Sequence, residues 1–105
     1  MEENIHTYEL EWSGITIEIR YTPSWSKSYL EIYGYPLVHI EIEAIQPKKA
    51  PLPITNTGFK SHFIQTNETF SVSNPVTYVR EWLDEAAKSK EWIEQQESLN
   101  QMSLF

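Results

Sequence analysis

The chain lacks cysteine, has only three glycines, and is short of positive charge. Its 105 residues carry eight Lys and Arg against fifteen Asp and Glu, a formal net charge of −7. The absence of cysteine excludes disulfides, thiolate nucleophiles and cysteine-based zinc sites, and three scattered glycines form no phosphate-binding loop. The deficit of cations argues against direct nucleic-acid binding, because such binding depends on Lys and Arg contacts to phosphate.

Long apolar runs are also missing. None follows Met1, and none approaches the length needed to span a bilayer. We therefore expect a cytoplasmic protein without a membrane partner.

The composition is that of one globular domain, with 40 % hydrophobic and 22 % charged residues and four Trp and six Tyr to fill a small core.

The acidic residues are unevenly distributed along the chain. Residues 1–45 hold eight acidic residues against two basic ones, a net of −6, whereas 46–70 have a net of +2 and 71–105 a net of −3. The N-terminal half is therefore the acidic part.

Two runs of period-two alternation near the N-terminus predict a β-hairpin. They are joined by Ser13-Gly14, a two-residue turn of the kind that favours tight hairpins. In that register the core-facing pairs are Trp12 with Ile15, Leu10 with Ile17, and Tyr8 with Ile19.

The chain from 22 to 65 predicts one or two more strands. Residues 22–36 lose the alternation, which predicts a loop with a short strand or turn near Tyr29–Tyr33. Alternation returns over 38–44 and predicts a third strand, followed by an extended proline-rich connection over 46–58. Residues 59–64 are consistent with a short fourth strand, for which we expect Phe59 and Phe63 to face the core.

A single helix, Asn74–Gln95, is predicted to follow. Asn74 suits the N-cap and Pro75 the first helical position, and apolar residues form one stripe: Val76, Val79, Leu83, Ala86 and Ala87. The predicted fold is α+β, an antiparallel sheet of three or four strands covered by this one long C-terminal helix. We expect 1–98 to form the domain and 99–105 a flexible C-terminal peptide after a polar spacer.

Candidate catalytic and metal-binding residues do not group along the chain. Ser61 and His62 are neighbours, yet on an extended segment their side chains point to opposite faces. His6, His39 and His62 lack the spacing of metal ligands. We therefore expect no enzyme activity, no metal and no cofactor, and interpret His62 as a structural histidine.

The glutamates of the predicted strands would share the face away from the core, offset only by Arg20 and His39: Glu9, Glu11, Glu18, Glu41 and Glu43. One interpretation is solubility and protection of sheet edges. The other is a DNA mimic, in which carboxylates on a rigid scaffold occupy the basic cleft of a DNA-acting defence enzyme, as anti-restriction or anti-CRISPR inhibitors would.

The last five residues, Gln101, Met102, Ser103, Leu104 and Phe105, read QMSLF. This sequence resembles the short peptide by which many bacterial DNA polymerases, repair and mobile-element proteins bind the ring-shaped DNA sliding clamp: Gln, a variable residue, Ser or Asp, Leu and Phe. Met102 stands where Leu is commoner. The resemblance implies that Leu104 and Phe105 are anchors, Gln101 a hydrogen-bonding group and Ser103 a polar spacer. Alternatively, Leu104 and Phe105 pack back on the domain.

Two stretches, PLPITNTGFKSHF (51–63) and YVREWLDEAA (78–87), resemble small uncharacterised proteins of bacterial plasmids and genomic islands, some of which end in a clamp-type peptide. The leading hypothesis is thus a non-enzymatic adaptor that binds the sliding clamp, with the DNA mimic as the alternative. A third is a structural subunit that forms a homodimer through its tail and exposed aromatic residues.

Overall fold

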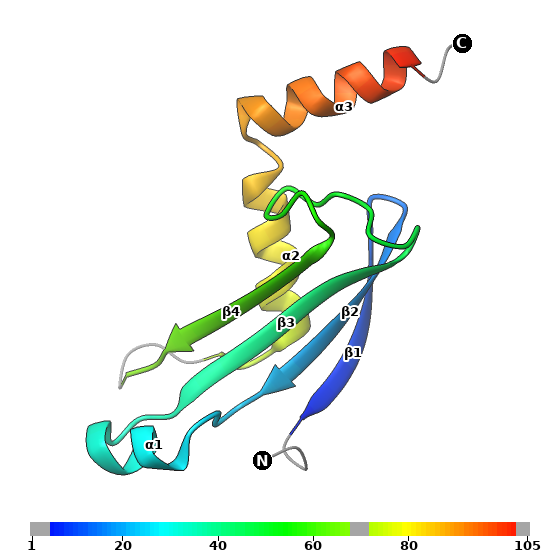
Figure 1. Ribbon diagram of the computed structural model, residues 1–105. Coiled ribbons are helices and arrows are strands. Elements are labelled where there is room, and N and C mark those ends of the chain that lie inside the picture. The colour runs from blue at the N-terminus through cyan, green and yellow to red at the C-terminus, as the bar shows by residue number, and fades with distance from the viewer. Residues whose placement is uncertain (1–4, 68–71, 103–105) are drawn as a thin grey trace.

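The structure is a computed structural model that describes residues 5–67 and 72–102, the last four of these by their backbone only. Four strands form an antiparallel sheet in the order β1-β2-β3-β4, so each strand pairs with its neighbour in sequence (Figure 1). The elements are β1 His6–Trp12, β2 Ile15–Thr22, α1 Lys27–Tyr33, β3 Leu37–Gln46, β4 Phe59–Gln65, α2 Pro75–Ala86 and α3 Lys90–Met102. Within the described ranges, no helix combines the length and the apolar character needed to cross a membrane.

The N-terminal hairpin forms in the predicted register. Ser13 and Gly14 have φ angles of 51° and 80°, and positive φ at both residues is the requirement of a type I′ turn, whose twist matches that of paired strands. The observed pairs include those expected: Trp12 opposite Ile15, Leu10 opposite Ile17, and Tyr8 opposite Ile19.

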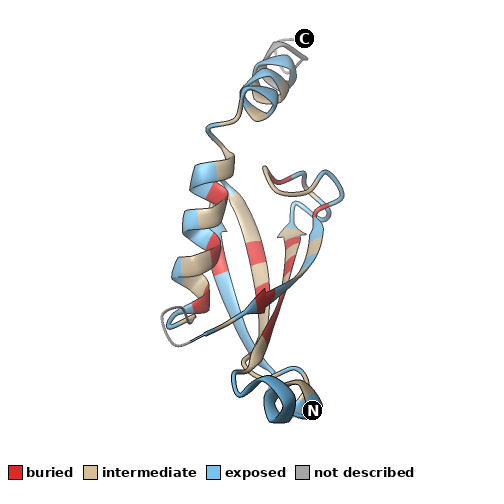
Figure 2. Cartoon of the chain, turned by 90° about the vertical axis from the view of Figure 1, so that its left-hand side faces the viewer, coloured by how far each residue is buried: buried red, intermediate tan, exposed pale blue. Residues whose placement is uncertain are grey.

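The core lies between one face of the sheet and α2, which contacts β1 and β2. In Figure 2 the buried residues of α2 lie on the side that faces the strands. Because side chains alternate across a strand, every second residue enters this layer. The buried apolar side chains are Leu10, Ile17, Ile19, Val38, Ile40, Ile42, Ala44, Leu52, Ile64, Val79 and Leu83.

The predicted start of the helix is confirmed, but the single long helix is wrong. The Asn74 side chain accepts a hydrogen bond from the Thr77 N–H at 3.1 Å, and Pro75 is the first residue of α2. The helix then ends at Ala86, and α3 begins at Lys90. At the break, the Ser89 hydroxyl accepts from the Trp92 N–H at 3.2 Å, which is an N-cap contact.

The predicted single helix would be somewhat longer than the strands that α2 contacts. A helix over 74–95 would be about 33 Å long at 1.5 Å per residue. The two strands that α2 contacts have 7 and 8 residues, or roughly 24–27 Å. Only about 6–9 Å of such a helix would extend beyond these strands; in the structure α2 ends earlier, at Ala86, and α3 extends away from the sheet (Figure 1).

The expected loop at 22–36 contains a helix, so the prediction of a strand or turn near Tyr29–Tyr33 is wrong. The Ser26 hydroxyl caps α1 by accepting from the Tyr29 N–H at 3.1 Å. Gly34 ends the helix with a φ of 81°, a conformation that glycine adopts without steric cost. No residue of α1 is buried.

The fourth strand exists, but the prediction that Phe59 and Phe63 face the core is wrong. Ile64 is buried on the α2 side, while Phe59 and Phe63 remain 42 % and 47 % exposed on the opposite face. His62 faces α2 and packs against Trp82 in a tilted contact, with ring centroids 4.7 Å apart. Shifting the alternation by one residue exchanges the two faces of a strand. The two phenylalanines suggested that the odd-numbered residues of β4 face the core, whereas the even-numbered ones do.

The connection over 46–58 is held close to the sheet by Leu52, which is buried, and by Gly58. Gly58 has a φ of 79°, and a Cβ added there would lie 2.7 Å from the backbone of Lys49. Gly14 has nearly the same φ, 80°, and nothing within 4 Å of an added Cβ. The two glycines therefore have the same backbone conformation, but only Gly14 has room for a Cβ atom.

We predict that Gly58→Ala destabilises the fold more than Gly14→Ala. The left-handed conformation costs about 1–2 kcal/mol for a residue with a Cβ, and the collision with Lys49 adds roughly 1–3 kcal/mol in Gly58→Ala alone. Urea denaturation followed by Trp fluorescence measures both losses. Equal losses in the two variants would contradict the close approach of Gly58 to Lys49.

Candidate interaction surfaces

The C-terminal peptide begins on α3, which extends away from the sheet (Figure 1). Gln101 and Met102 belong to the last turn of α3 by their backbone, while Ser103, Leu104 and Phe105 lie outside the described residues. The polar spacer that the sequence predicts after Gln95 is part of α3, which continues to Met102. Near its start α3 contacts the body through Trp92, whose ring lies 6.2 Å from that of Trp12.

Strand pairing places the five glutamates on the sheet face opposite α2. Glu18 lies opposite Glu9 on one side and Glu43 on the other, so three carboxylates form one row across β1, β2 and β3. Glu41 lies in the next row, opposite Arg20. Like charges in direct opposition destabilise a sheet, so this face needs a compensating group.

Arg20 is that group. Its Nε donates to Glu41 Oε1 at 2.8 Å, and its Nη2 donates to Glu43 Oε1 at 3.1 Å. Its Nη1 donates to Glu18. The hydrogen bond to Glu41, more than any other contact, raises the pKa of Arg20 above its ordinary value. One guanidinium thus holds three carboxylates.

Excess negative charge remains on the face. Five carboxylates and one guanidinium leave a formal charge of −4. Glu9 and Glu11 lie outside the Arg20 cluster, and both are exposed. Glu11 accepts a hydrogen bond from the Thr16 hydroxyl at 2.5 Å, a contact that leaves its charge in place.

Three rings form an aromatic platform on the same face, beside α1: Trp25, His39 and Phe63. The His39 ring lies 4.5 Å from both of the others, and Trp25 meets Phe63 at 5.5 Å and 75°. His39 is 6 % exposed, whereas Trp25 remains 43 % exposed. The Trp25 N–H donates to the Leu37 carbonyl at 2.7 Å, which fixes Trp25 against the start of β3.

His39 forms a hydrogen bond of 2.8 Å with Ser61. Burial lowers the pKa of His39, an effect that Glu41 partly offsets. A neutral histidine bonded to serine can activate a nucleophile, but catalysis also needs donors for a developing oxyanion. The N–H groups that β3 and β4 direct at each other belong to the ladder. We interpret the pair as satisfying a buried ring.

The three histidines lie apart. His6 meets Tyr21 at 6.4 Å, His39 belongs to the aromatic platform, and His62 lies on the α2 side. Burial foremost, and then nearby Lys60, lowers the pKa of His62. Over 5–67 and 72–102, no three or more His, Asp or Glu side chains are grouped so as to hold a metal ion.

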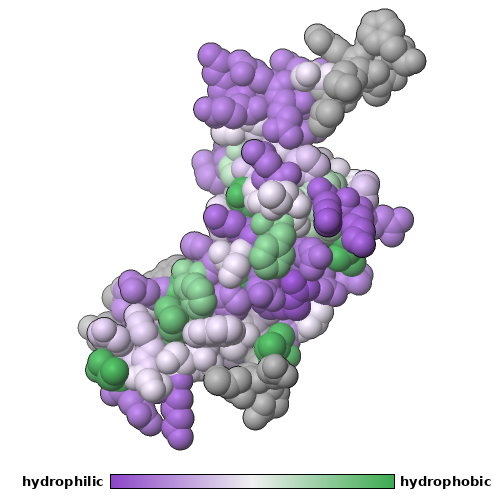
Figure 3. All heavy atoms as spheres, viewed as in Figure 1, coloured by the Kyte–Doolittle hydropathy of each residue, from purple (hydrophilic) through white to green (hydrophobic). Residues whose placement is uncertain are grey.

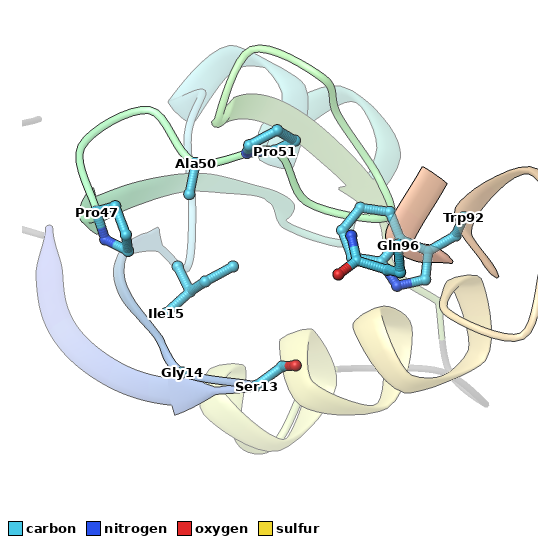
Figure 4. A pocket seen from close by; sticks show the side chains of 8 residues that line it. All are labelled: Ser13, Gly14, Ile15, Pro47, Ala50, Pro51, Trp92 and Gln96. Carbon is cyan, nitrogen blue, oxygen red and sulfur yellow. The ribbon is translucent and has the colours of Figure 1, made fainter. Parts of the chain in front are cut away.

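A pocket of about 290 Å³ lies where the hairpin turn, the proline-rich connection and α3 meet (Figure 4). Its lining carries no charged side chain, and Trp92 and Gln96 close it from α3. The lining residues are Ser13, Gly14, Ile15, Pro47, Ala50, Pro51, Trp92 and Gln96. Ligand sites usually measure about 300–1,000 Å³, so this pocket is at the lower limit.

The sequence does not predict the aromatic platform, because it places Phe63 in the core and residues 22–36, which include Trp25, in a loop. Ser26 and Gly34, a serine cap and a glycine stop eight residues apart, were the available signals for α1. The position of His39 between Trp25 and Phe63 depends on pairing across β3 and β4, which no local pattern encodes.

A family model described as KlcB third domain matches residues 5–92. The match therefore includes the sheet, α1, α2 and the first residues of α3, and it ends before most of α3 and the C-terminal peptide. Searches of curated proteins and of solved structures found no match.

We predict that Arg20→Gln lowers the free energy of unfolding by roughly 1–3 kcal/mol, because it removes three charge-assisted hydrogen bonds and leaves the carboxylates facing each other. The loss should shrink in 1 M salt, which screens both attraction and repulsion. Urea denaturation at low and high salt measures it. Lys88→Gln, which removes an exposed cation paired with Glu85 at 3.4 Å, is the control and should change little.

We also predict that stability falls as the pH drops from about 7 to about 5.5. The pKa values of His39 and His62 lie below the ordinary 6.5 in the folded state, so the unfolded chain takes up protons first and is favoured. Urea denaturation at several pH values should show this decline, and the double variant His39→Gln/His62→Gln should flatten it. If the double variant showed the same decline, the loss of stability would be due to titratable groups other than His39 and His62.

Proposed function

We propose, from the premise that the chain belongs to the KlcB third domain family, that it is a non-enzymatic cytoplasmic adaptor that binds the bacterial DNA sliding clamp through Gln101–Phe105. The observation that supports this most is positional. The clamp-type sequence begins at the far end of α3, which extends beyond the sheet (Figure 1). Together with the resemblances of 51–63 and 78–87, it points to a protein of a mobile-element setting.

The binding energy would come from Leu104 and Phe105. Burying each in a partner pocket yields about 1.5–3 kcal/mol, whereas a micromolar complex requires about 8 kcal/mol. The peptide alone would therefore bind weakly, and the repeated sites of a ring-shaped partner would add avidity. The 13 residues of α3 span about 20 Å, which keeps the sheet clear of the partner surface.

Clamp binding on this proposal is a property of this chain rather than of the family. The family match ends at residue 92, ahead of the peptide. The body would then supply a second function common to the family, and the peptide would determine where that function is delivered.

The absence of enzyme activity is part of the proposal. The one serine–histidine hydrogen bond found in the described ranges, Ser61 with His39, has ladder-bonded backbone on both sides and no acid bonded to the ring. A carboxylate usually orients the histidine of a nucleophilic site. This contact is better explained by the packing of His39 between Trp25 and Phe63.

The alternative function, a DNA mimic, is favoured by one observation: all five glutamates share one face with a formal charge of −4. Arg20 weakens it, because three of the five carboxylates are hydrogen-bonded to a cation. Mimicry of phosphates would use exposed carboxylates, of which Glu9 and Glu11 are the best candidates. This function would survive loss of the C-terminal peptide, whereas clamp binding would not.

Titration calorimetry against a purified bacterial sliding clamp tests the leading proposal. We expect the intact chain to bind with a dissociation constant in the micromolar range or weaker, and deletion of Gln101–Phe105 or Leu104→Ala/Phe105→Ala to abolish detectable binding. Ile32→Ala/Tyr33→Ala removes comparable exposed apolar surface from α1 and is the matched control. Binding that persists after the deletion, or is absent from the intact chain, would reject the proposal.

A further inference from the structure

Exposed apolar side chains lie on the sheet face opposite α2 and on α1. On the face opposite α2, Trp25, Phe59 and Phe63 are each more than 40 % exposed, and α1 adds Ile32 at 72 % and Tyr33 at 61 %. Hydrophobic side chains surround a hydrophilic centre on the face turned to the viewer in Figure 3. Of these side chains, Trp25 and Phe63 contact each other, and exposed apolar surface gathered in this way marks an interaction site.

The aromatic platform and the glutamates are parts of one surface. Along β3, His39, Glu41 and Glu43 follow each other on the same face, and residues two apart on a strand are separated by roughly 7 Å. The rings therefore lie next to the Arg20 cluster. Measured from His39 along the strand direction, the row of Glu9, Glu18 and Glu43 lies about 13 Å away.

Charge decides what can occupy this surface. Nucleic acid could stack on the rings, but its phosphates would meet a face of formal charge −4 whose Arg20 is already bound by carboxylates, with Lys27 beside Trp25. A second copy placed face to face would set one row of glutamates against another. A cationic polypeptide avoids repulsion by the glutamates, and its aliphatic stems pack on the rings.

We propose that this face is a docking surface for an extended, Arg- or Lys-containing segment of a partner protein. One cation lies over the exposed ring of Trp25 or Phe63, where cation–π attraction acts within about 6 Å. A second pairs with Glu9 or Glu11, which Arg20 leaves unbound. Phe63 on β4 and Glu9 on β1 are four residues apart along the strands and three strand spacings apart across the sheet. The two positions are therefore separated by roughly 19 Å, or about six residues of extended chain.

Arg20 makes such a surface possible in the free protein. By holding Glu18, Glu41 and Glu43, it removes most of the repulsion that would otherwise destabilise the sheet. This docking surface does not depend on the clamp peptide, since the two lie on different elements.

Selection from a phage-displayed library of random dodecapeptides tests the proposal. The bait is the full chain carrying Leu104→Ala/Phe105→Ala, which removes the tail anchors. We expect the selected peptides to be enriched in Arg and Lys, with basic residues about six apart. Selected peptides without basic residues, or no selected peptides, would overturn the proposal.

Variants then locate the site for a selected peptide by calorimetry. Trp25→Ala and Phe63→Ala should each weaken binding about two- to tenfold, as expected for loss of a cation–π contact. Glu9→Gln/Glu11→Gln should weaken it by a similar factor that shrinks at high salt. Glu81→Gln/Glu94→Gln removes two exposed charges from α2 and α3 and should have no effect. Equal losses in both glutamate pairs would show nonspecific attraction and overturn the proposal.

Two further measurements exclude the other occupants. The indole N–H signal of Trp25, assigned with Trp25→Phe, should shift on titration with the peptide, whereas a shift confined to Trp12, Trp82 or Trp92 would place the site elsewhere. Sedimentation should give a monomer at all concentrations. A dimer that Trp25→Ala dissociates would assign the face to a second copy. Clamp binding is measured separately, so failure of either proposal leaves the other intact.

Discussion

Val79 and Leu83 of α2 lie fully buried against the apolar side chains of the first three strands, and the rest of the molecule depends on this layer. This core lies on one face of the four-stranded sheet, and the buried side chains of α2 belong to it. The other face is left without a helix. The polar and aromatic side chains on that face are therefore free to vary without loss of the core, within the limits set by their own repulsion.

Those limits are visible in the Arg20 cluster. A row of glutamates across three strands would be costly on its own. A single guanidinium, 26 % exposed, presents its planar donors to three carboxylates at once. Lysine, with one compact ammonium group, could not match this geometry. The acidity of the face is thus maintained by one residue whose side chain has no part in the core.

Local patterns predicted the fold where they agreed with each other. Alternation together with Ser13-Gly14 specified the hairpin and its register, and Asn74-Pro75 specified the start of α2. Prediction failed where the deciding information was not local. The phase of β4 depends on which neighbours Phe63 and His62 meet across β3. The break between α2 and α3 is different, because the Ser89 cap is a local signal that the apolar stripe does not reveal.

Of the two candidate surfaces on the sheet, one could be predicted from local sequence patterns and the other could not. The glutamates of the exposed face follow from alternation alone, so they could be identified without a structure. The aromatic platform could not, because Trp25, His39 and Phe63 come from three separate segments. The assignment of Phe63 to the core hid the one feature that gives this acidic face an apolar component.

The helical character of α3 also determines how the chain would place two partners. A flexible spacer of 13 residues would hold its ends at a fluctuating distance of about 20 Å, free to sample every direction. A helix of the same residues spans a similar length with a fixed direction, and the molecule measures 57 Å along its longest axis. A partner at the sheet face and a partner at the C-terminal end of α3 would therefore be held at a fixed distance and in a fixed relative direction.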